Sequence, residues 1–123
     1  FSAKGHELAQ VLLALSLDHP HDAAGVYYRS RPFMLSVGLT VEEALAAGMG
    51  KPHSPSEGRD VGVVFSLPPR GGPTVLPSSG AVGAQFTPVA GWAQAIRYRA
   101  EVLGEAKWDG AIAVALAGEG AAL

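Results

Sequence analysis

Cysteine is absent from the 123 residues, and charged residues make up only 16% of them. The absence of cysteine excludes disulfide bonds and thiolate chemistry, and it fits a reducing compartment. The net charge of −2 argues against a basic patch for nucleic acid or for a membrane surface. No apolar run is long enough to cross a bilayer, and no signal peptide is visible. We therefore expect no nucleic acid and no membrane among the partners.

Glycine, in contrast, is abundant, with 16 residues, and alanine is frequent. This composition indicates close packing of the backbone. The length suits one domain or part of one. Because the chain starts at Phe1 and stops just after a glycine-rich motif, we interpret residues 1–123 as a single partial domain of a longer protein.

The last stretch of the chain carries the strongest structural signal. Ala111 to Ala117 are seven consecutive apolar residues, which predict a parallel strand buried on both faces. The run ends in Gly118, Glu119 and Gly120. Ligands bind at the carboxyl ends of parallel strands, where glycines let backbone amides approach a phosphate. A carboxylate there can hold a magnesium ion that bridges to the phosphate. An ordinary tight turn after the strand is the alternative.

The spacing of Gly118 and Gly120 also permits the start of a dinucleotide-binding fingerprint. That pattern needs a third small residue where Leu123 stands. A lone Gly-x-Gly is a weak signal, so the upstream segments decide between the two interpretations.

Residues 5–17 show the periodicity of a helix. Leu13 and Leu17 widen its apolar stripe towards full burial. The stripe itself consists of Leu8, Val11, Leu12 and Leu15.

Two shorter helices are predicted next. Pro32 suits the first turn of a brief helix near residues 33–37. Thr40 and Glu43 form a capping box, which predicts a helix that runs to about residue 47. Gly48 is the expected glycine just beyond its end.

Residues 50–80 are rich in glycine, proline and serine, and they predict a long loop of the functional or mobile kind. We expect part of it, such as residues 62–66, to pack. A further helix is predicted to run to about Glu101, with Pro88 near its first turn. Its small-residue face, suited to close packing on a sheet, consists of Ala90, Ala93, Ile96 and Ala100.

Tyr27, Tyr28 and Arg29 form an extended segment in this interpretation. A tyrosine hydroxyl beside a guanidinium can hydrogen-bond and charge-pair one diphosphate. Aromatic packing beside a surface arginine is an equally good explanation from these residues alone.

The histidines do not form a catalytic or metal-binding pattern. His19 and His21 flank a proline in a polar turn, for which a solvated loop is the favoured interpretation. His6 and His53 suit the surface, and there is no Gly-x-Ser-x-Gly elbow. We therefore expect no general acid or base in this chain.

The order of the segments resembles one family. The chain presents, in turn, Gly5-His6-Glu7, Tyr27-Tyr28-Arg29, Gly58-Arg59, Gly80 to Gln85 and Gly118 to Ala121. This series resembles the alpha subunit, or the alpha-like half of a fused chain, of the thiamine-diphosphate-dependent first component of 2-oxo acid dehydrogenase complexes, such as the pyruvate and branched-chain enzymes. The resemblance covers nearly the whole chain.

The resemblance implies a role for each matching residue. Tyr28 and Arg29 would contact the cofactor diphosphate, the backbone of Gly80 and Val82 would meet the aminopyrimidine ring, and Glu119 would ligate magnesium. The complete set of implied cofactor-binding residues is Tyr28, Arg29, Gly80, Val82, Gly118, Gly120 and Ala121.

The resemblance further implies an α/β fold, namely the helix-rich N-terminal part of a parallel-sheet domain that binds thiamine diphosphate. The complete enzyme would oxidatively decarboxylate a 2-oxo acid and pass the acyl group to a lipoyl carrier, whereas the chain alone would be inactive. The implied partners are a beta subunit or beta-like half, in a heterotetramer, and a lipoyl-bearing acyltransferase. The implied location is the cytoplasm of bacteria or the mitochondrial matrix. The alternative from another class is a non-catalytic nucleotide- or phosphate-binding module.

Two residues depart from the family pattern. The family has an aspartate at the position of Glu119, and the additional methylene moves the carboxylate by roughly 1.5 Å. Magnesium tolerates little geometric error. Many relatives also carry a histidine a few residues after the arginine that matches Arg59, and residues 60–66 contain none.

Overall fold

The computed structural model describes residues 2–59 and 66–122 and contains a parallel sheet ordered β2-β1-β3. The strands are β1 (Ala23–Gly25), β2 (Thr74–Val75) and β3 (Ala113–Ala115). Ala23 of the central strand pairs with Thr74 on one side and with Ala113 on the other. This arrangement confirms the predicted α/β class.

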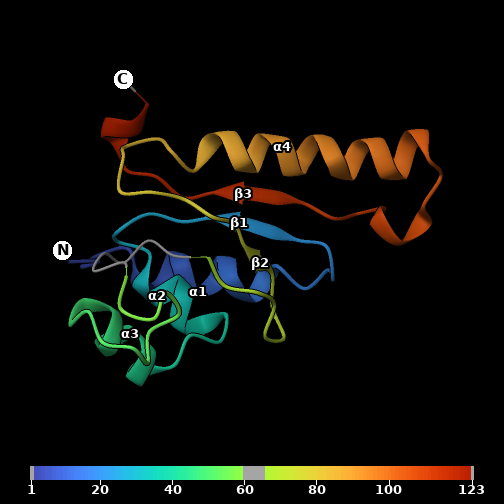
Figure 1. Ribbon diagram of the computed structural model, residues 1–123. Helices are drawn as coiled ribbons and strands as arrows, with labels where there is room; N and C mark the ends of the chain where they lie inside the picture. The colour runs from blue at the N-terminus through green and yellow to red at the C-terminus, as the bar shows by residue number, and fades with distance from the viewer. Residues whose placement is uncertain (1, 60–65, 123) are drawn as a thin grey trace.

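Helices cover both faces of this sheet. In chain order they are α1 (Glu7–Ser16), α2 (Arg31–Ser36), α3 (Val41–Gly48) and α4 (Phe86–Arg97). Figure 1 shows α4 on one side of the strands and the other three helices on the opposite side. A π-helical turn, η1 (Tyr98–Val102), continues α4, and two 3-10 turns follow, η2 (Ala106–Trp108) and η3 (Glu119–Ala121).

Alternation along β1 separates two apolar clusters, because successive strand side chains point to opposite faces. Ala24 belongs to the larger cluster, which also includes Phe33 and Met34 of α2. Ala23 belongs to the smaller cluster with Val89 of α4. Every residue of β1 is buried, so this short strand, and not the C-terminal one, is the centre of the fold.

The prediction for the C-terminal run is wrong in its burial. Only Ala113–Ala115 form a strand, and β3 lies at the edge of the sheet because it pairs with β1 alone. Ala115 is exposed and Ile112 keeps 48% of its surface. The apolar composition correctly indicates a strand, but composition cannot say how many neighbours the strand has in this chain.

The prediction for the N-terminal helix is correct in type and wrong in its buried face. Leu8, Leu12 and Leu15 of α1 are 71%, 54% and 70% exposed. The helix instead buries Gln10 and Ala14, which lie one turn apart. Leu8, Leu12 and Leu15 therefore face away from the sheet of this chain, whereas Leu13 and Leu17, which were predicted to widen the stripe, pack on the larger cluster.

The other helices agree more closely with the sequence. Pro32 lies in the first turn of α2, and Pro88 lies in the first turn of α4. The helix predicted to end near Glu101 continues to Val102, although its last turn, η1, is π-helical from Tyr98 onward. The buried residues of α4 are Val89 and Ile96. Ile96 belongs to the predicted face, but Ala90 of the same face is exposed.

The capping box at the start of α3 is present. The Thr40 hydroxyl accepts from the Glu43 amide at 3.0 Å, and the Glu43 carboxylate accepts from the Thr40 amide at 2.9 Å. The glycine at the other end differs from the prediction, since Gly48 is still helical and Gly50 takes the left-handed conformation with a φ of 63°.

The long loop contributes β2, and Leu67 forms an antiparallel bridge with Val75. The packing expected of residues 62–66 falls mostly outside the described residues. Over the described ranges, no helix is long and apolar enough to cross a membrane.

Asp22 fastens the three strands together where they start. One oxygen of its buried carboxylate accepts from the Ile112 amide at 2.8 Å, and the other accepts from the His19 amide at 3.0 Å. Its backbone carbonyl accepts from the Thr74 amide at 2.9 Å. Asp22 is only 2% exposed, so these amides replace the water that the carboxylate loses on folding.

We predict that Asp22→Ala lowers the free energy of unfolding by roughly 3 kcal/mol, since each hydrogen bond to a charged group contributes about 1.5–3 kcal/mol. Asp22→Asn, which keeps the oxygen that faces Ile112, should lose less. Urea denaturation measures both. Exposed Asp18→Ala is the matched control. Equal stability of Asp22→Ala and the parent would show that the sheet does not depend on this carboxylate.

Glu43 also joins α3 to the long loop. Arg70 donates to both oxygens of the Glu43 carboxylate, at 2.7 and 2.9 Å, and to the Gly38 carbonyl at 3.2 Å. The hydrogen-bonded Arg70 guanidinium, together with the Thr40 amide, lowers the pKa of Glu43 from 4.5 to about 2.

Arg70→Gln should return the pKa of Glu43 towards its ordinary value. A depressed carboxyl pKa adds stability above the unfolded value, and this stability is lost as the pH falls from about 4.5 to about 2. We therefore expect parent and variant to differ by about 1 kcal/mol near neutral pH and to converge in acid. An NMR titration of the Glu43 carboxyl and denaturation at several pH values test this. An unchanged titration would contradict it.

Candidate functional site

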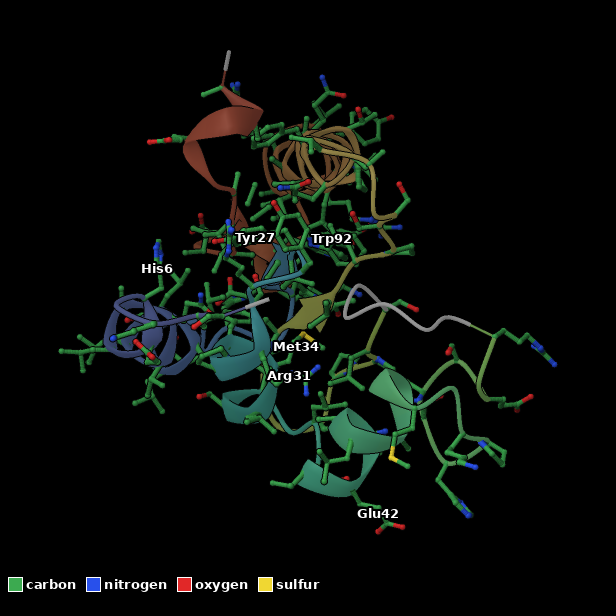
Figure 2. The ribbon with its side chains drawn as sticks, turned by 90° about the vertical axis from the view of Figure 1, so that its left-hand side faces the viewer. His6, Tyr27, Arg31, Met34, Glu42 and Trp92 are labelled. Atoms are coloured by element: carbon green, nitrogen blue, oxygen red, sulfur yellow. The ribbon has the colours of Figure 1, made fainter. Side chains whose placement is uncertain are left out.

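Three segments surround one cavity of about 330 Å³ where β1 and β3 end. They are residues 27–29 after β1, residues 79–85 before α4 and residues 118–121 after β3. In Figure 1 the C-terminal turn and the loop before α4 gather at the left-hand end of the strands. Figure 2 looks onto this end and shows Tyr27 between α1 and the C-terminal turn.

All eight residues predicted from the sequence line this cavity. They are Tyr28, Arg29, Gly80, Val82, Gly118, Glu119, Gly120 and Ala121. Five other residues line the cavity without a role assigned from the sequence, namely Tyr27, Ser79, Ala81, Gly83 and Gln85. The structure therefore brings together segments that lie up to 94 positions apart, from Tyr27 to Ala121.

Tyr28 and Arg29 lie in a tight turn, which corrects the prediction of an extended segment. Strand β1 ends at Gly25, and the Ser30 amide donates to the Tyr27 carbonyl at 2.9 Å. The Ser30 hydroxyl, in turn, accepts from the Tyr27 amide at 3.2 Å. Ser30 is only 1% exposed, so the turn that carries Arg29 is held from inside the protein.

Arg29 is the available cation of the cavity. Over residues 2–59 and 66–122 it forms no ion pair with a carboxylate, whereas four other arginines do. Its guanidinium carbon lies 5.2 Å from the centre of the Tyr28 ring. A Cβ atom built on Gly118 would lie 4.0 Å from Arg29 Nη1. The guanidinium thus stands beside the glycine turn, where it can pair with an anion.

Glu119 carries the only carboxylate among the described residues that line the cavity. It is exposed and begins the 3-10 turn η3. The Ala121 amide in this turn already donates to the Gly118 carbonyl at 3.1 Å. A Cβ atom built on Gly120 would have no heavy atom within 4 Å, so the space around this glycine is open.

A bound metal would need ligands beyond the acidic and histidine side chains of the described residues. In the described part of the chain, no three side chains of His, Asp or Glu lie close enough together to hold a metal ion. One carboxylate, one guanidinium and glycine backbone nevertheless match the two ends of a metal–diphosphate group, because the cation suits phosphate and the carboxylate suits magnesium.

Gln85 joins the two loops on the α4 side of the cavity. Its side chain is 3% exposed, and Nε2 donates to the Leu116 carbonyl at 2.8 Å. Gly25 makes this approach possible. A Cβ atom there would lie 2.5 Å from Val89 Cγ2 and 3.0 Å from the Gln85 carbonyl oxygen. A glutamine in a glycine-rich stretch gives no sequence signal for such burial.

The loop before α4 leaves one wall of the cavity accessible. Val82 is 67% exposed, and a Cβ atom on Gly80 would meet nothing within 4 Å. Gly83 has a φ of 85°, a left-handed conformation that favours glycine. The turn therefore presents backbone, rather than bulky side chains, to the cavity.

The histidines take no part in the cavity. His21 stacks on Trp108 with 3.8 Å between ring centroids, near the amino ends of the strands. His6 and His53 are exposed, in agreement with the prediction for both residues. The aromatic stack shows that His21 is a packing residue, which sequence spacing alone does not indicate.

Comparison with known proteins supplies the family. A model of the dehydrogenase E1 component family matches residues 1–123. None of the curated proteins compared with the chain matches it significantly. The family match includes all three segments around the cavity, and it does not favour the alternative of a non-catalytic phosphate-binding module. The chain therefore belongs to the dehydrogenase E1 component family, the thiamine-diphosphate-dependent components of 2-oxo acid dehydrogenases.

Proposed function

We propose that this chain supplies the diphosphate- and magnesium-binding part of an alpha-type E1 enzyme. The enzyme oxidatively decarboxylates a 2-oxo acid and transfers the acyl group to a lipoyl carrier. The observation that carries the proposal is the arrangement of Arg29 beside Gly118, in a cavity whose only carboxylate among the described lining residues is Glu119. This charge distribution suits a metal–diphosphate and lies at the sheet edge where ligands of α/β proteins bind.

Each side of the cavity has a separate task in this proposal. Arg29 pairs with the diphosphate, and Tyr28 lies beside the guanidinium. Glu119 would hold magnesium through its carboxylate, the kind of oxygen ligand that this ion prefers. Because the Ala121 amide is engaged by Gly118, the Gly120 amide is the better donor to the diphosphate.

The exposed loop at Gly80 and Val82 receives the aminopyrimidine ring. Its backbone groups can hydrogen-bond the ring edge because no bulky side chain covers Gly80. Thiamine diphosphate, when bound, supplies the electron sink for loss of carbon dioxide, while the protein supplies orientation and electrostatics. No lining residue of this chain is a suitable general base for that chemistry, since Glu119 is assigned to the metal.

A partner must therefore complete the active site. E1 components generally work with a beta subunit and a lipoyl acyltransferase. We assign the proton-transfer groups of the reaction to the beta-type partner, and the acyl acceptor to the lipoyl-bearing acyltransferase.

The first test is Arg29→Ala in the E1 enzyme assembled with its beta-type partner. Loss of a charge-assisted hydrogen bond costs about 1.5–3 kcal/mol, so thiamine diphosphate should bind roughly ten- to a hundredfold more weakly. Calorimetric titration measures the dissociation constant. Arg97→Ala is the control, because Arg97 pairs with Glu101 on the surface of α4. Parental affinity in Arg29→Ala would remove Arg29 from the site.

The second test concerns Glu119 and magnesium. Glu119→Ala should abolish the magnesium dependence of cofactor binding, whereas Glu119→Asp should retain it because aspartate preserves the carboxylate. The measurement is cofactor affinity across a magnesium titration of the assembled enzyme, with exposed Glu42→Ala as the control. If both Glu119 variants respond to magnesium like the parent, Glu119 is a turn residue and not a metal ligand.

A further inference from the structure

Gln10 is a buried polar residue on α1, a helix on which Leu8, Leu12 and Leu15 are exposed. It is 4% exposed, although Leu8 and Leu12 of the same helix are more than half exposed. A buried amide is costly unless both of its polar atoms find partners. Gln10 shares the inward face of α1 with Leu13 and Ala14, which pack on the larger cluster, so its polar atoms need partners inside the protein.

Both polar atoms of the Gln10 side chain bond to the segment that carries Arg29. Its Nε2 donates to the Arg29 carbonyl at 3.1 Å, and its Oε1 accepts from the Phe33 amide at 3.3 Å. The Phe33 amide lies in the first turn of α2, where backbone amides lack helical partners. Pro32 has no amide hydrogen, so it cannot donate a hydrogen bond in this turn. One side chain thus fixes both ends of the link between Arg29 and α2.

The two hydrogen bonds of the Gln10 side chain help to fix the position of the Arg29 backbone. Within the described residues, no carboxylate holds its guanidinium, so the backbone turn sets the side chain's starting point. The turn is fixed by Ser30 from within and by Gln10 from α1. Gln10 itself does not line the cavity and cannot touch a ligand there.

We propose that Gln10 is a positioning residue that presents Arg29 to the cofactor diphosphate, an inference that rests on the proposed function. Gln10→Leu keeps the approximate volume but leaves the Arg29 carbonyl and the Phe33 amide without partners. Gln10→Asn keeps the amide on a side chain one methylene shorter, so it cannot span both partners. Gln10→Glu can still accept from Phe33 but cannot donate to Arg29.

The experiment uses the assembled E1 enzyme and thiamine diphosphate with saturating magnesium. Gln10→Leu should raise the KM and the dissociation constant for thiamine diphosphate about tenfold, while kcat at saturating cofactor stays within about twofold of the parent. Gln10→Asn should fall between Gln10→Leu and the parent. Gln94→Leu, which replaces an exposed glutamine of α4, is the matched control and should leave both constants unchanged.

A double-mutant cycle separates positioning from general stability. In an Arg29→Ala background, Gln10→Leu should have no further effect on cofactor affinity, because the residue that it positions is gone. An equal loss of affinity in both backgrounds, or a fall in kcat without a change in KM, would overturn the proposal. If Gln10→Leu does not fold, the same double-mutant cycle is measured with Gln10→Asn in its place. Parental affinity in Arg29→Ala alone would instead refute the role of Arg29 in the proposed function, whatever Gln10 does.

Discussion

The arrangement depends first on the buried carboxylate of Asp22. One carboxylate oxygen accepts from the Ile112 amide and the Asp22 backbone carbonyl accepts from the Thr74 amide, so β2 and β3 start level with β1. The other carboxylate oxygen accepts from the His19 amide in the turn before β1. Strands of only two or three residues have few ladder hydrogen bonds with which to fix their own register. Because β1 and β3 are parallel, start together and have three residues each, Gly25 and Ala115 end them at the same level. The cavity at their carboxyl ends follows from the carboxylate at their amino ends.

Small residues in β1 then allow α4 to pack closely against the sheet. Strand β1 contains only alanine and glycine, and Gly25 leaves room for Val89 and for the carbonyl of Gln85. The start of α4 thereby comes near enough for Gln85 to bond the end of β3. A larger residue at Gly25 would separate the loop before α4 from the C-terminal turn. The abundance of small residues in the sequence thus has a specific structural use at this position.

Local chemistry was predictable from the sequence, and long-range placement was not. The capping box of Thr40 and Glu43 involves neighbouring residues, so its pattern was sufficient. The residues named from the family resemblance also line one cavity, because the order of weak motifs reproduced that of a family. In contrast, the buried face of α1 and the edge position of β3 depend on contacts across the fold. The turn at Tyr28 and Arg29 depends on Ser30 and Gln10, which no local pattern indicates.

The errors in the burial predictions share one cause. An apolar pattern indicates a surface that is favourable to bury, but it does not indicate whether the same chain or a partner covers that surface. The outward leucines of α1, and similarly Val41 and Leu45 of α3, are exposed in this chain. E1 components generally work in assemblies, so such patterns need not be satisfied within one subunit. A buried polar side chain gives more specific information, because it must find its partners wherever it points. On α1, the inward-facing Gln10 therefore describes the fold of this chain better than the exposed Leu8, Leu12 and Leu15 do.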